Sequence, residues 1–132
     1  MRPLFVYGTL MDSDLLKAVL GRELRGVERM PARLADHAVE RAQGAAFPML
    51  VARPGAVAEG MLLIGLTRAD MVRLEAYETA LYQREPCLAE TTSGAVAAEL
   101  FLATGRLKSS GEPWRLADWQ ARHKRAVLGE ES

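Results

Sequence analysis

A short apolar run, Leu4-Phe5-Val6-Tyr7, ends at Gly8 and predicts a β-strand near the start of the chain. A few residues later, Asp12 or Ser13 can cap a helix whose apolar positions recur with helical spacing. Gly21 is placed to end that helix. The chain is therefore expected to begin with a strand, a glycine-containing turn and a helix.

Strand signals dominate the middle of the chain. We predict further strands over residues 32–41, 48–52, 57–66, 82–91 and 95–103. Gly60 lies inside the third of these and indicates a bend or bulge, because a glycine weakens a strand interior. Ser93-Gly94 supplies the turn between the last two strands.

Two more helices complete the prediction. Thr67 is a capping residue with the acidic Asp70 three positions later, so a helix is expected from there to residue 77 or 78. A last helix is expected from about Leu116 to Leu128. Six short strands with two or three helices in no regular alternation predict an α+β fold. Short turns between the strands favour a small, mostly antiparallel β-barrel.

The composition is that of an ordinary folded domain. The 132 residues are 49% hydrophobic and 26% charged, which argues against a disordered chain and leads us to expect one domain over residues 1–132. Seventeen basic and seventeen acidic residues cancel, so charge gives no argument for a nucleic-acid or anionic-membrane partner. We therefore expect neither of these partners.

The sequence shows no pattern typical of a metal site, an internal disulfide or a membrane span. Cys87 is the only cysteine, and the two histidines, His37 and His123, are far apart in the chain. No apolar run reaches the length of a signal-peptide core or a membrane span. The expected location is the cytoplasm.

Glu78 is the first candidate for chemistry. At 100° per residue, Met71, Leu74 and Glu78 fall on one narrow stripe of the predicted helix. Burial on an apolar stripe and the helix C-terminus would both raise the pKa of this carboxyl, toward the range useful to a general base. From geometry alone two alternatives stay open: the helix ends earlier and Glu78 turns to solvent, or the neighbouring Glu75 is the relevant carboxylate.

The second candidate is the Tyr7-Gly8-Thr9-Leu10 segment between the first strand and the first helix. A glycine after a buried strand lets backbone N–H groups approach a ligand closely, and amides near a helix start suit a carboxylate or an oxyanion. The alternative is that this segment is only a turn.

Other polar side chains have structural interpretations. Leu116, Trp119, His123 and Val127 share one face of the predicted last helix, so we expect His123 to be a packed or an edge histidine rather than a ligand. The serines stand in no Gly-x-Ser-x-Gly context, and no phosphate-binding loop is present.

Four short motifs in one order resemble a known family. The motifs are Phe5-Val6-Tyr7-Gly8-Thr9-Leu10, Phe47-Pro48-Met49-Leu50, Glu59-Gly60-Met61-Leu62, and Leu74-Glu75-Ala76-Tyr77-Glu78 followed by Leu81-Tyr82-Gln83-Arg84. In this order they resemble the γ-glutamyl cyclotransferase-like family, with the last segment similar to its γ-glutamylamine cyclotransferase branch. The resemblance spans residues 4 to about 103 and leaves the C-terminal helix, about 114–129, outside it.

The sequence departs from the family's pattern at two positions. Position 75 is Glu where the family usually has Asp, and Thr79 stands where Gly often follows the key glutamate. The second departure puts the path of the chain at the helix exit in doubt. The resemblance implies that Glu78, rather than Glu75, is the functional carboxylate.

The resemblance also implies a reaction and a set of site residues. The α-amine of a γ-glutamyl substrate attacks its own γ-carbonyl and releases 5-oxoproline and an amine, as in a transferase or lyase acting on a γ-glutamyl amide bond. No cofactor is implied, because nucleophile and electrophile share one molecule. Glu78 would act as base and then acid, and Tyr82 would line the pocket. The glutamyl end would be held by the loop of Tyr7, Gly8, Thr9 and Leu10.

Two other function classes remain open at this point. One is a non-catalytic module on the same barrel that binds a small ligand or a partner. The other is a different amide-bond enzyme, such as one that trims a γ-glutamyl protecting group. Among γ-glutamyl compounds, the motif at 82–84 favours γ-glutamylamines over glutathione, whose terminal carboxylate needs a cationic partner. Two alternatives stay open for Arg84: it is that partner, or it points away into solvent.

Overall fold

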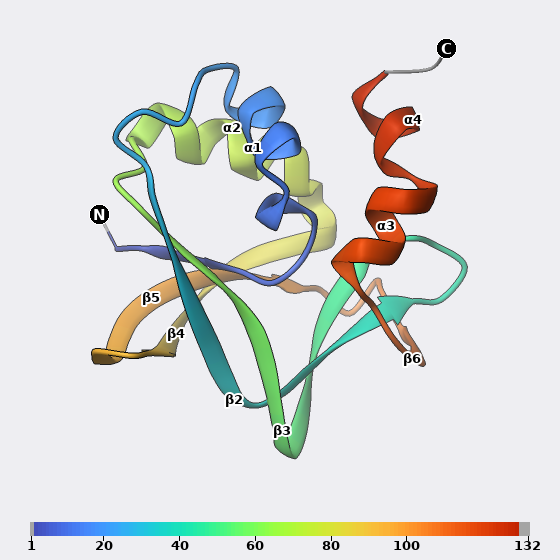
Figure 1. Cartoon of the computed structure of the whole chain (residues 1–132). Helices are drawn as coiled ribbons and strands as arrows, with labels where there is room; N and C mark the ends of the chain where they lie inside the picture. The colour runs from blue at the N-terminus through green and yellow to red at the C-terminus, as the bar shows by residue number, and fades with distance from the viewer. Residues whose placement is uncertain (1, 130–132) are drawn as a thin grey trace.

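The computed structural model describes residues 2–129, and these residues form a mixed β-barrel with flanking helices (Figure 1). The strands are β1 (Leu4–Val6), β2 (Glu28–Ala42), β3 (Pro48–Ile64), β4 (Tyr82–Thr91), β5 (Gly94–Ala103) and β6 (Ser109–Pro113). The sheet order is β3-β1-β5-β4-β2-β6, and a further β3–β2 pairing closes the first five strands into a barrel. Only the β1–β5 pairing is parallel among the strand pairs described. The predicted α+β barrel is confirmed.

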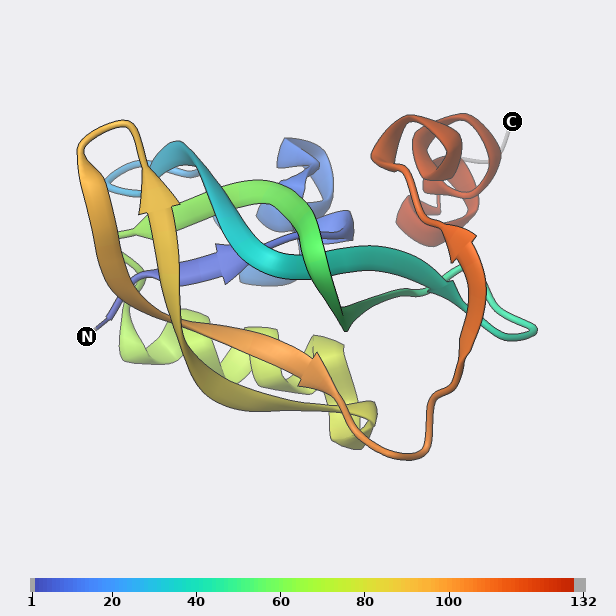
Figure 2. The ribbon, with the colours of Figure 1, turned by 90° about the horizontal axis from the view of Figure 1, so that it is seen from below.

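The helices lie outside the barrel. They are α1 (Ser13–Leu20), α2 (Arg68–Glu78), α3 (Leu116–Arg122) and α4 (Lys124–Leu128), with short 3-10 turns η1 (Thr9–Met11) and η2 (Thr79–Leu81). Figure 1 shows α1 and α2 together over one end of the barrel and α3 with α4 standing beside them. In Figure 2 the α3–α4 pair lies at the end of the molecule opposite the β4–β5 turn. Among these described helices, none is both long and apolar enough to cross a membrane.

The first two helices begin where the sequence predicts. Asp12 caps α1, because its Oδ1 accepts the backbone N–H of Leu15 at 2.9 Å, and Gly21 ends the helix at φ 67°. Thr67 and Asp70 form a reciprocal capping box at the start of α2. Local capping chemistry therefore fixes both starts.

The predicted strands over 48–52 and 57–66 are one strand, β3, which corrects the sequence prediction. Its ladder with β2 pairs His37 with Ala52 and Ala35 with Val57, so residues 53–56 bulge opposite Asp36 without ending the strand. The N–H of Gly55 donates to Asp36 Oδ1 at 2.9 Å across this bulge. Pairing with β2 on both sides keeps the strand continuous through Pro54-Gly55.

Gly60 does not mark the bulge that we expected at its position. It pairs in regular register with Ala32, and the irregularity lies elsewhere in the ladder. A Cβ built on Gly60 would lie 2.2 Å from the carbonyl oxygen of Val6 and 2.9 Å from Phe5 Cζ. Glycine is therefore required because β1 approaches β3 closely at this point.

The predicted C-terminal helix is broken in two, so the described chain has four α-helices where we expected two or three. His123 leaves helical geometry, with φ −126° and ψ −22°, and separates α3 from α4. The break lies next to Lys124, whose Nζ is 2.9 Å from carboxylate oxygens of both Asp12 and Asp14. These tertiary contacts lie outside the periodicity from which one continuous helix was predicted.

The core is divided into clusters that connect these layers. One fills the barrel and includes Phe5, Leu62 and Leu100. A second, which includes Leu16, Leu63 and Leu74, lies between the barrel and the helices α1 and α2. The third joins the C-terminal helices to α1 through Leu15, Trp114 and Trp119.

Candidate active site

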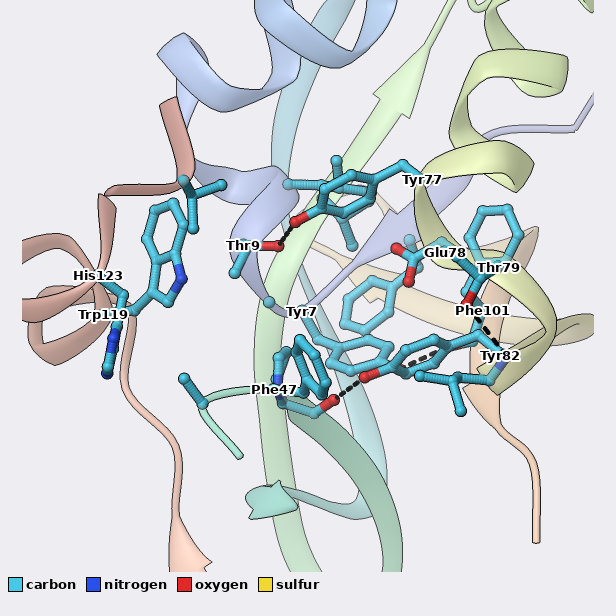
Figure 3. A pocket seen from close by; sticks show the side chains of 18 of the residues that line it. Tyr7, Thr9, Phe47, Tyr77, Glu78, Thr79, Tyr82, Phe101, Trp119 and His123 are labelled. Atoms are coloured by element: carbon cyan, nitrogen blue, oxygen red, sulfur yellow. Dashed lines mark hydrogen bonds between the residues drawn. The ribbon is translucent and has the colours of Figure 1, made fainter. Parts of the chain in front are cut away.

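A cavity of about 360 Å³ lies where these layers meet. The loop after β1, the C-terminal end of α2, the start of β3 and the α3–α4 pair all line it. Figure 3 shows Glu78 and Tyr82 on one side of this cavity and Trp119 on the other. Thr9 and Tyr77 lie between these two sides.

The structure brings all six predicted site residues into this one cavity. Its lining includes Glu78 from the end of α2, Tyr82 from the start of β4, and Tyr7, Gly8, Thr9 and Leu10 from the loop. Glu75 lies outside the cavity, exposed, with its Oε1 3.3 Å from Arg84 Nη1. Of the two carboxylates that the sequence left open, only Glu78 faces the cavity.

Glu78 is a partly buried carboxyl whose environment is mainly apolar. Met71 and Leu74, which share its helix face, are 5% and 0% exposed, as the helical spacing predicts. Across residues 2–129, no cationic side chain forms an ion pair with Glu78. Burial raises the pKa of Glu78 from 4.5 to about 7. Such a group can accept and release a proton near neutral pH.

Three tyrosines surround Glu78 with their hydroxyls already engaged. The Tyr7 hydroxyl donates to the carbonyl of Phe101, and the Tyr82 hydroxyl donates to the carbonyl of Pro48 at 2.6 Å. Burial, and then the negative charge of Glu78, raise the pKa values of Tyr7 and Tyr82 above their ordinary value. These phenols therefore stay neutral and define the shape of the cavity.

Tyr77 connects the end of α2 to the loop after β1. Its hydroxyl lies 2.8 Å from Thr9 Oγ1, in a hydrogen bond that either group can donate. Burial is also the main cause that raises the pKa of Tyr77. The contact ties Glu78, the next residue, to this loop.

Gly8 is sterically confined by Pro48. Its φ is −130°, so no left-handed conformation demands glycine here. A Cβ at Gly8 would lie 2.5 Å from Pro48 Cγ, a ring atom that has little freedom to move. The close approach is that of Pro48 to the loop, and both residues line the cavity.

Thr79 shows how this chain leaves α2 without the glycine of the family pattern. Its backbone has φ 61° and ψ −168°, a region that is occupied almost only by glycine. Its N–H donates to the carbonyl of Glu75 and its Oγ1 accepts the N–H of Leu81 at 3.3 Å. The strained turn ends the helix immediately after Glu78.

The cavity has a wall that the sequence analysis did not assign to the site. Trp119, His123, Ala126 and Val127 of the C-terminal helices line it together with Phe47. Trp119, His123 and Val127 share a face as predicted, and this face lines the cavity. His123 is exposed, which fits the edge position and not the packed one of the two that we expected. The helical spacing predicted that these residues share a face, but it could not predict that this face lines a cavity.

Arg84 lies in a separate, charged hollow. Its Nη1 contacts Glu75 and its Nε is 3.7 Å from Glu99 Oε2, and these three residues line the hollow with Arg2 and Arg68. Arg84 is absent from the lining of the Glu78 cavity, which corrects the suggestion that it could pair with a substrate carboxylate there. Within residues 2–129, no cluster of three or more His, Cys, Asp and Glu side chains is arranged to hold a metal ion.

The chain is similar to known proteins in sequence and in fold. Residues 4–121 match the family model described as "Gamma-glutamyl cyclotransferase, AIG2-like", so the match includes β6 and most of α3. The AIG2-like protein A of Arabidopsis thaliana is 26% identical over 128 residues, which cover 94% of this chain and 75% of that protein.

Two solved structures illustrate the similarity in fold. A second Arabidopsis thaliana protein, solved in solution, superposes with a TM-score of 0.72 at 23% identity, covering 98% of this chain and 87% of its own. A structure named gamma-glutamyl cyclotransferase gives a TM-score of 0.68 at 16% identity, covering 82% of this chain and 69% of its own.

Proposed function

The chain belongs to the γ-glutamyl cyclotransferase, AIG2-like family, and on this premise we propose that it releases 5-oxoproline from a γ-glutamyl amine or peptide. The observation that carries the proposal is the position of Glu78, a carboxyl in a mainly apolar cavity beside the loop of residues 7–10. Glu78 is the group proposed to move the proton.

The reaction moves two protons, in turn, from the α-nitrogen of the substrate to its leaving nitrogen. Glu78 takes a proton from the substrate's α-ammonium, and the freed amine attacks the γ-carbonyl carbon. A new C–N bond closes the five-membered ring while the original amide C–N bond breaks. Glu78 returns this proton to the leaving nitrogen as the amide bond breaks, then takes the second proton from the ring nitrogen and passes it to the released amine. The products are 5-oxoproline and the protonated amine, and the carboxylate of Glu78 is regenerated. A pKa of about 7 suits both steps.

The remaining site residues would select the folded conformer of the substrate. Backbone amides of Tyr7, Gly8, Thr9 and Leu10 are proposed to hold the glutamyl end, where they would also stabilise charge on the attacked carbonyl oxygen. Tyr82 is proposed to line the pocket beside Glu78. Holding amine and carbonyl together gives access to the large effective molarity of intramolecular attack, on the order of 10⁵ M or more.

A product assay tests this proposal. The purified protein is incubated with γ-glutamyl alkylamines, γ-glutamyl dipeptides and glutathione, and 5-oxoproline, glutamate and free amine are quantified. The proposal predicts 5-oxoproline and free amine in equal amounts from at least one class. Free glutamate in place of 5-oxoproline would indicate a hydrolytic amide-bond enzyme. Saturable binding with no product would indicate a small-ligand-binding module on the same fold.

A further inference from the structure

The C-terminal helix pair lines the part of the cavity farthest from Glu78. Figure 3 shows Trp119 and His123 across the cavity from Glu78, beyond Thr9 and Tyr77. In the proposed reaction the glutamyl part of the substrate must contact both Glu78 and the loop. In the proposed binding mode the group attached to the γ-nitrogen extends toward the side of the cavity away from Glu78, which α3, α4 and Phe47 line.

We propose that α3 and α4, with Phe47, form the subsite for the leaving amine. The substituent on the nitrogen of that amine is called the arm below, and this subsite selects compact, uncharged apolar arms such as benzyl or branched alkyl groups. This inference rests on the proposed function and names its substrate class. It excludes arms that end in a carboxylate or an ammonium group.

The side chains at this end of the cavity are mainly apolar. Trp119 is 4% exposed and presents an aromatic surface to the cavity. Phe47 and Val127 are among the most exposed large apolar side chains of the described chain, at 49% and 52%, and both line this cavity. An apolar arm seated between them removes their surfaces from water, which is favourable in proportion to the area covered.

The lining of this cavity contains few charged side chains. Among the described residues that line the cavity, none is Lys or Arg, and Glu78 and His123 are the only ionisable ones besides the tyrosines. Arg84 is paired with Glu75 and Glu99 in the other hollow. At this end of the cavity an ammonium on the arm would meet no anionic side chain, and a carboxylate would meet only His123, so burying either charge is unfavourable.

The α3–α4 wall is held rigidly in place. Asp12, 3% exposed, accepts hydrogen bonds on Oδ2 from Gln120 Nε2 at 2.7 Å and from Lys124 at 2.9 Å. Trp114 donates from Nε1 to the carbonyl of Ala46 at 2.9 Å, next to Phe47. The α3–α4 wall and the segment next to Phe47 are therefore both held in place before a ligand binds, which reduces the entropy lost on binding.

The size of the cavity sets a limit on the arm. A volume of about 360 Å³ lies near the lower end of the range of about 300–1,000 Å³ typical of small-molecule sites. The glutamyl group takes part of this space, so a compact ring or branched chain fits better than the Cys-Gly part of glutathione. This agrees with the charge argument in disfavouring glutathione.

The test compares substrates that share the glutamyl group and differ only in the arm. We measure kcat/KM for γ-glutamyl-benzylamine, γ-glutamyl-isobutylamine, γ-glutamylglycine, glutathione and γ-glutamyl-ε-lysine by 5-oxoproline release. The two apolar arms are expected to exceed the three charged ones by at least about 10-fold, the scale of discrimination in an apolar pocket. Equal rates, or a preference for any charged arm, would overturn the inference and leave the proposed function intact.

A substitution at the subsite sharpens the comparison. Val127→Lys places a cation at the arm end and is expected to raise kcat/KM for γ-glutamylglycine and to lower it for the benzyl compound. Val72→Lys is the matched control, because Val72 is equally apolar, 62% exposed, and lines the other hollow. The control is expected to leave the preference unchanged. A Val127→Lys protein with the original preference would contradict the placement of the arm.

A binding measurement separates this inference from the catalytic proposal. Calorimetric titration of the Glu78→Gln protein with the benzyl and glycine compounds is expected to give at least about 10-fold tighter binding of the benzyl arm, with a negative heat-capacity change. If the wild-type protein releases no 5-oxoproline but this selectivity is found, the subsite stands and the proposed reaction fails. If neither compound binds, the subsite fails as well.

Discussion

The hydroxyl of Tyr77 and Oγ1 of Thr9 lie 2.8 Å apart, and this hydrogen bond joins the last turn of α2 to the loop after β1. Glu78 follows Tyr77 directly, so the bond fixes the distance between the proposed proton carrier and the proposed glutamyl-binding loop. Both elements are also held independently, by the capping box at the start of α2 and by Asp12 at the start of α1. The two sides of the site are thus parts of one connected framework.

Gly8→Val should distort the loop after β1, because the new side chain would clash with Pro48. The added Cβ would lie 2.5 Å from Pro48 Cγ, and overpacking of this kind costs about 1–3 kcal/mol. We expect a lower free energy of unfolding in urea and loss of substrate turnover. Gly105→Val is the control, since nothing lies within 4 Å of a Cβ there and its φ is not positive. Unimpaired turnover in the Gly8 variant would show that the loop does not require this close approach.

Thr79→Gly should stabilise the protein. Thr79 occupies a backbone region that costs a non-glycine residue about 1–3 kcal/mol, and glycine relieves this strain at a smaller entropic cost. The free energy of unfolding should rise by about 1 kcal/mol. Thr79→Ala keeps the Cβ and removes only the hydroxyl, so it should bring no gain. A glycine variant that is less stable than the wild type would mean that the turn is not strained.

The ion pair between the partly exposed Arg22 and the buried Asp70 should make stability depend on pH in acid. Hydrogen bonds from Arg22 to both oxygens, at 3.0 and 2.7 Å, are the main cause that lowers the pKa of Asp70 to about 2. The ionised form is favoured in the folded state, so this stability is present above about pH 4 and is lost as the pH falls through 2.

Asp70→Asn tests this pair. At pH 7 the substitution should lower the free energy of unfolding by about 2 kcal/mol, and the deficit should shrink toward zero near pH 2. Asp118→Asn, at an exposed position of α3, is the control and should change little. A deficit that is the same at pH 7 and pH 2 would show that ionisation of Asp70 is not its source.

Glu78 should destabilise the folded protein above neutral pH. Its pKa is 4.5 in a solvated chain and about 7 in the fold, so the folded state keeps the proton that the unfolded state loses. Stability therefore falls as the pH rises from about 4.5 to 7 and then stays level, with a total cost of up to about 3 kcal/mol.

The stability of Glu78→Gln relative to the wild type should therefore grow with pH. Urea unfolding at pH 4 and pH 8 should show the variant gaining up to about 3 kcal/mol between the two values. Glu75→Gln, on the exposed side of α2, should show no such gain. If the Glu78→Gln protein shows no such gain, the Glu78 carboxyl of the wild type is well solvated in the folded protein.

The sequence predicted those parts of the fold that depend on nearby residues. The caps at Asp12 and Thr67 act over three residues, and the β4–β5 hairpin needs only its own turn. The merging of two predicted strands into β3 depends on pairing with β2, which continues on both sides of residues 53–56. Such pairing cannot be judged from one segment alone.

The same distinction applies to the site. The helical stripe of Met71 and Leu74 pointed to Glu78, because the spacing is a property of one helix and an apolar stripe predicts that its residues are buried. The wall formed by Trp119 and Val127 was missed, because its place beside the cavity depends on contacts such as Asp12 to Lys124 between segments distant in sequence. A periodic pattern shows which residues share a face, but not which surface that face meets.

The most direct test of the account is the rate of 5-oxoproline release from a γ-glutamyl alkylamine by three proteins: the wild type, Glu78→Gln and Glu75→Gln. The account predicts that Glu78→Gln remains folded and loses at least about 100-fold in turnover, the scale of general acid–base catalysis, while Glu75→Gln stays close to the wild type. Near-normal turnover by Glu78→Gln, or a greater loss in Glu75→Gln, would contradict the assignment of Glu78 as the proton carrier.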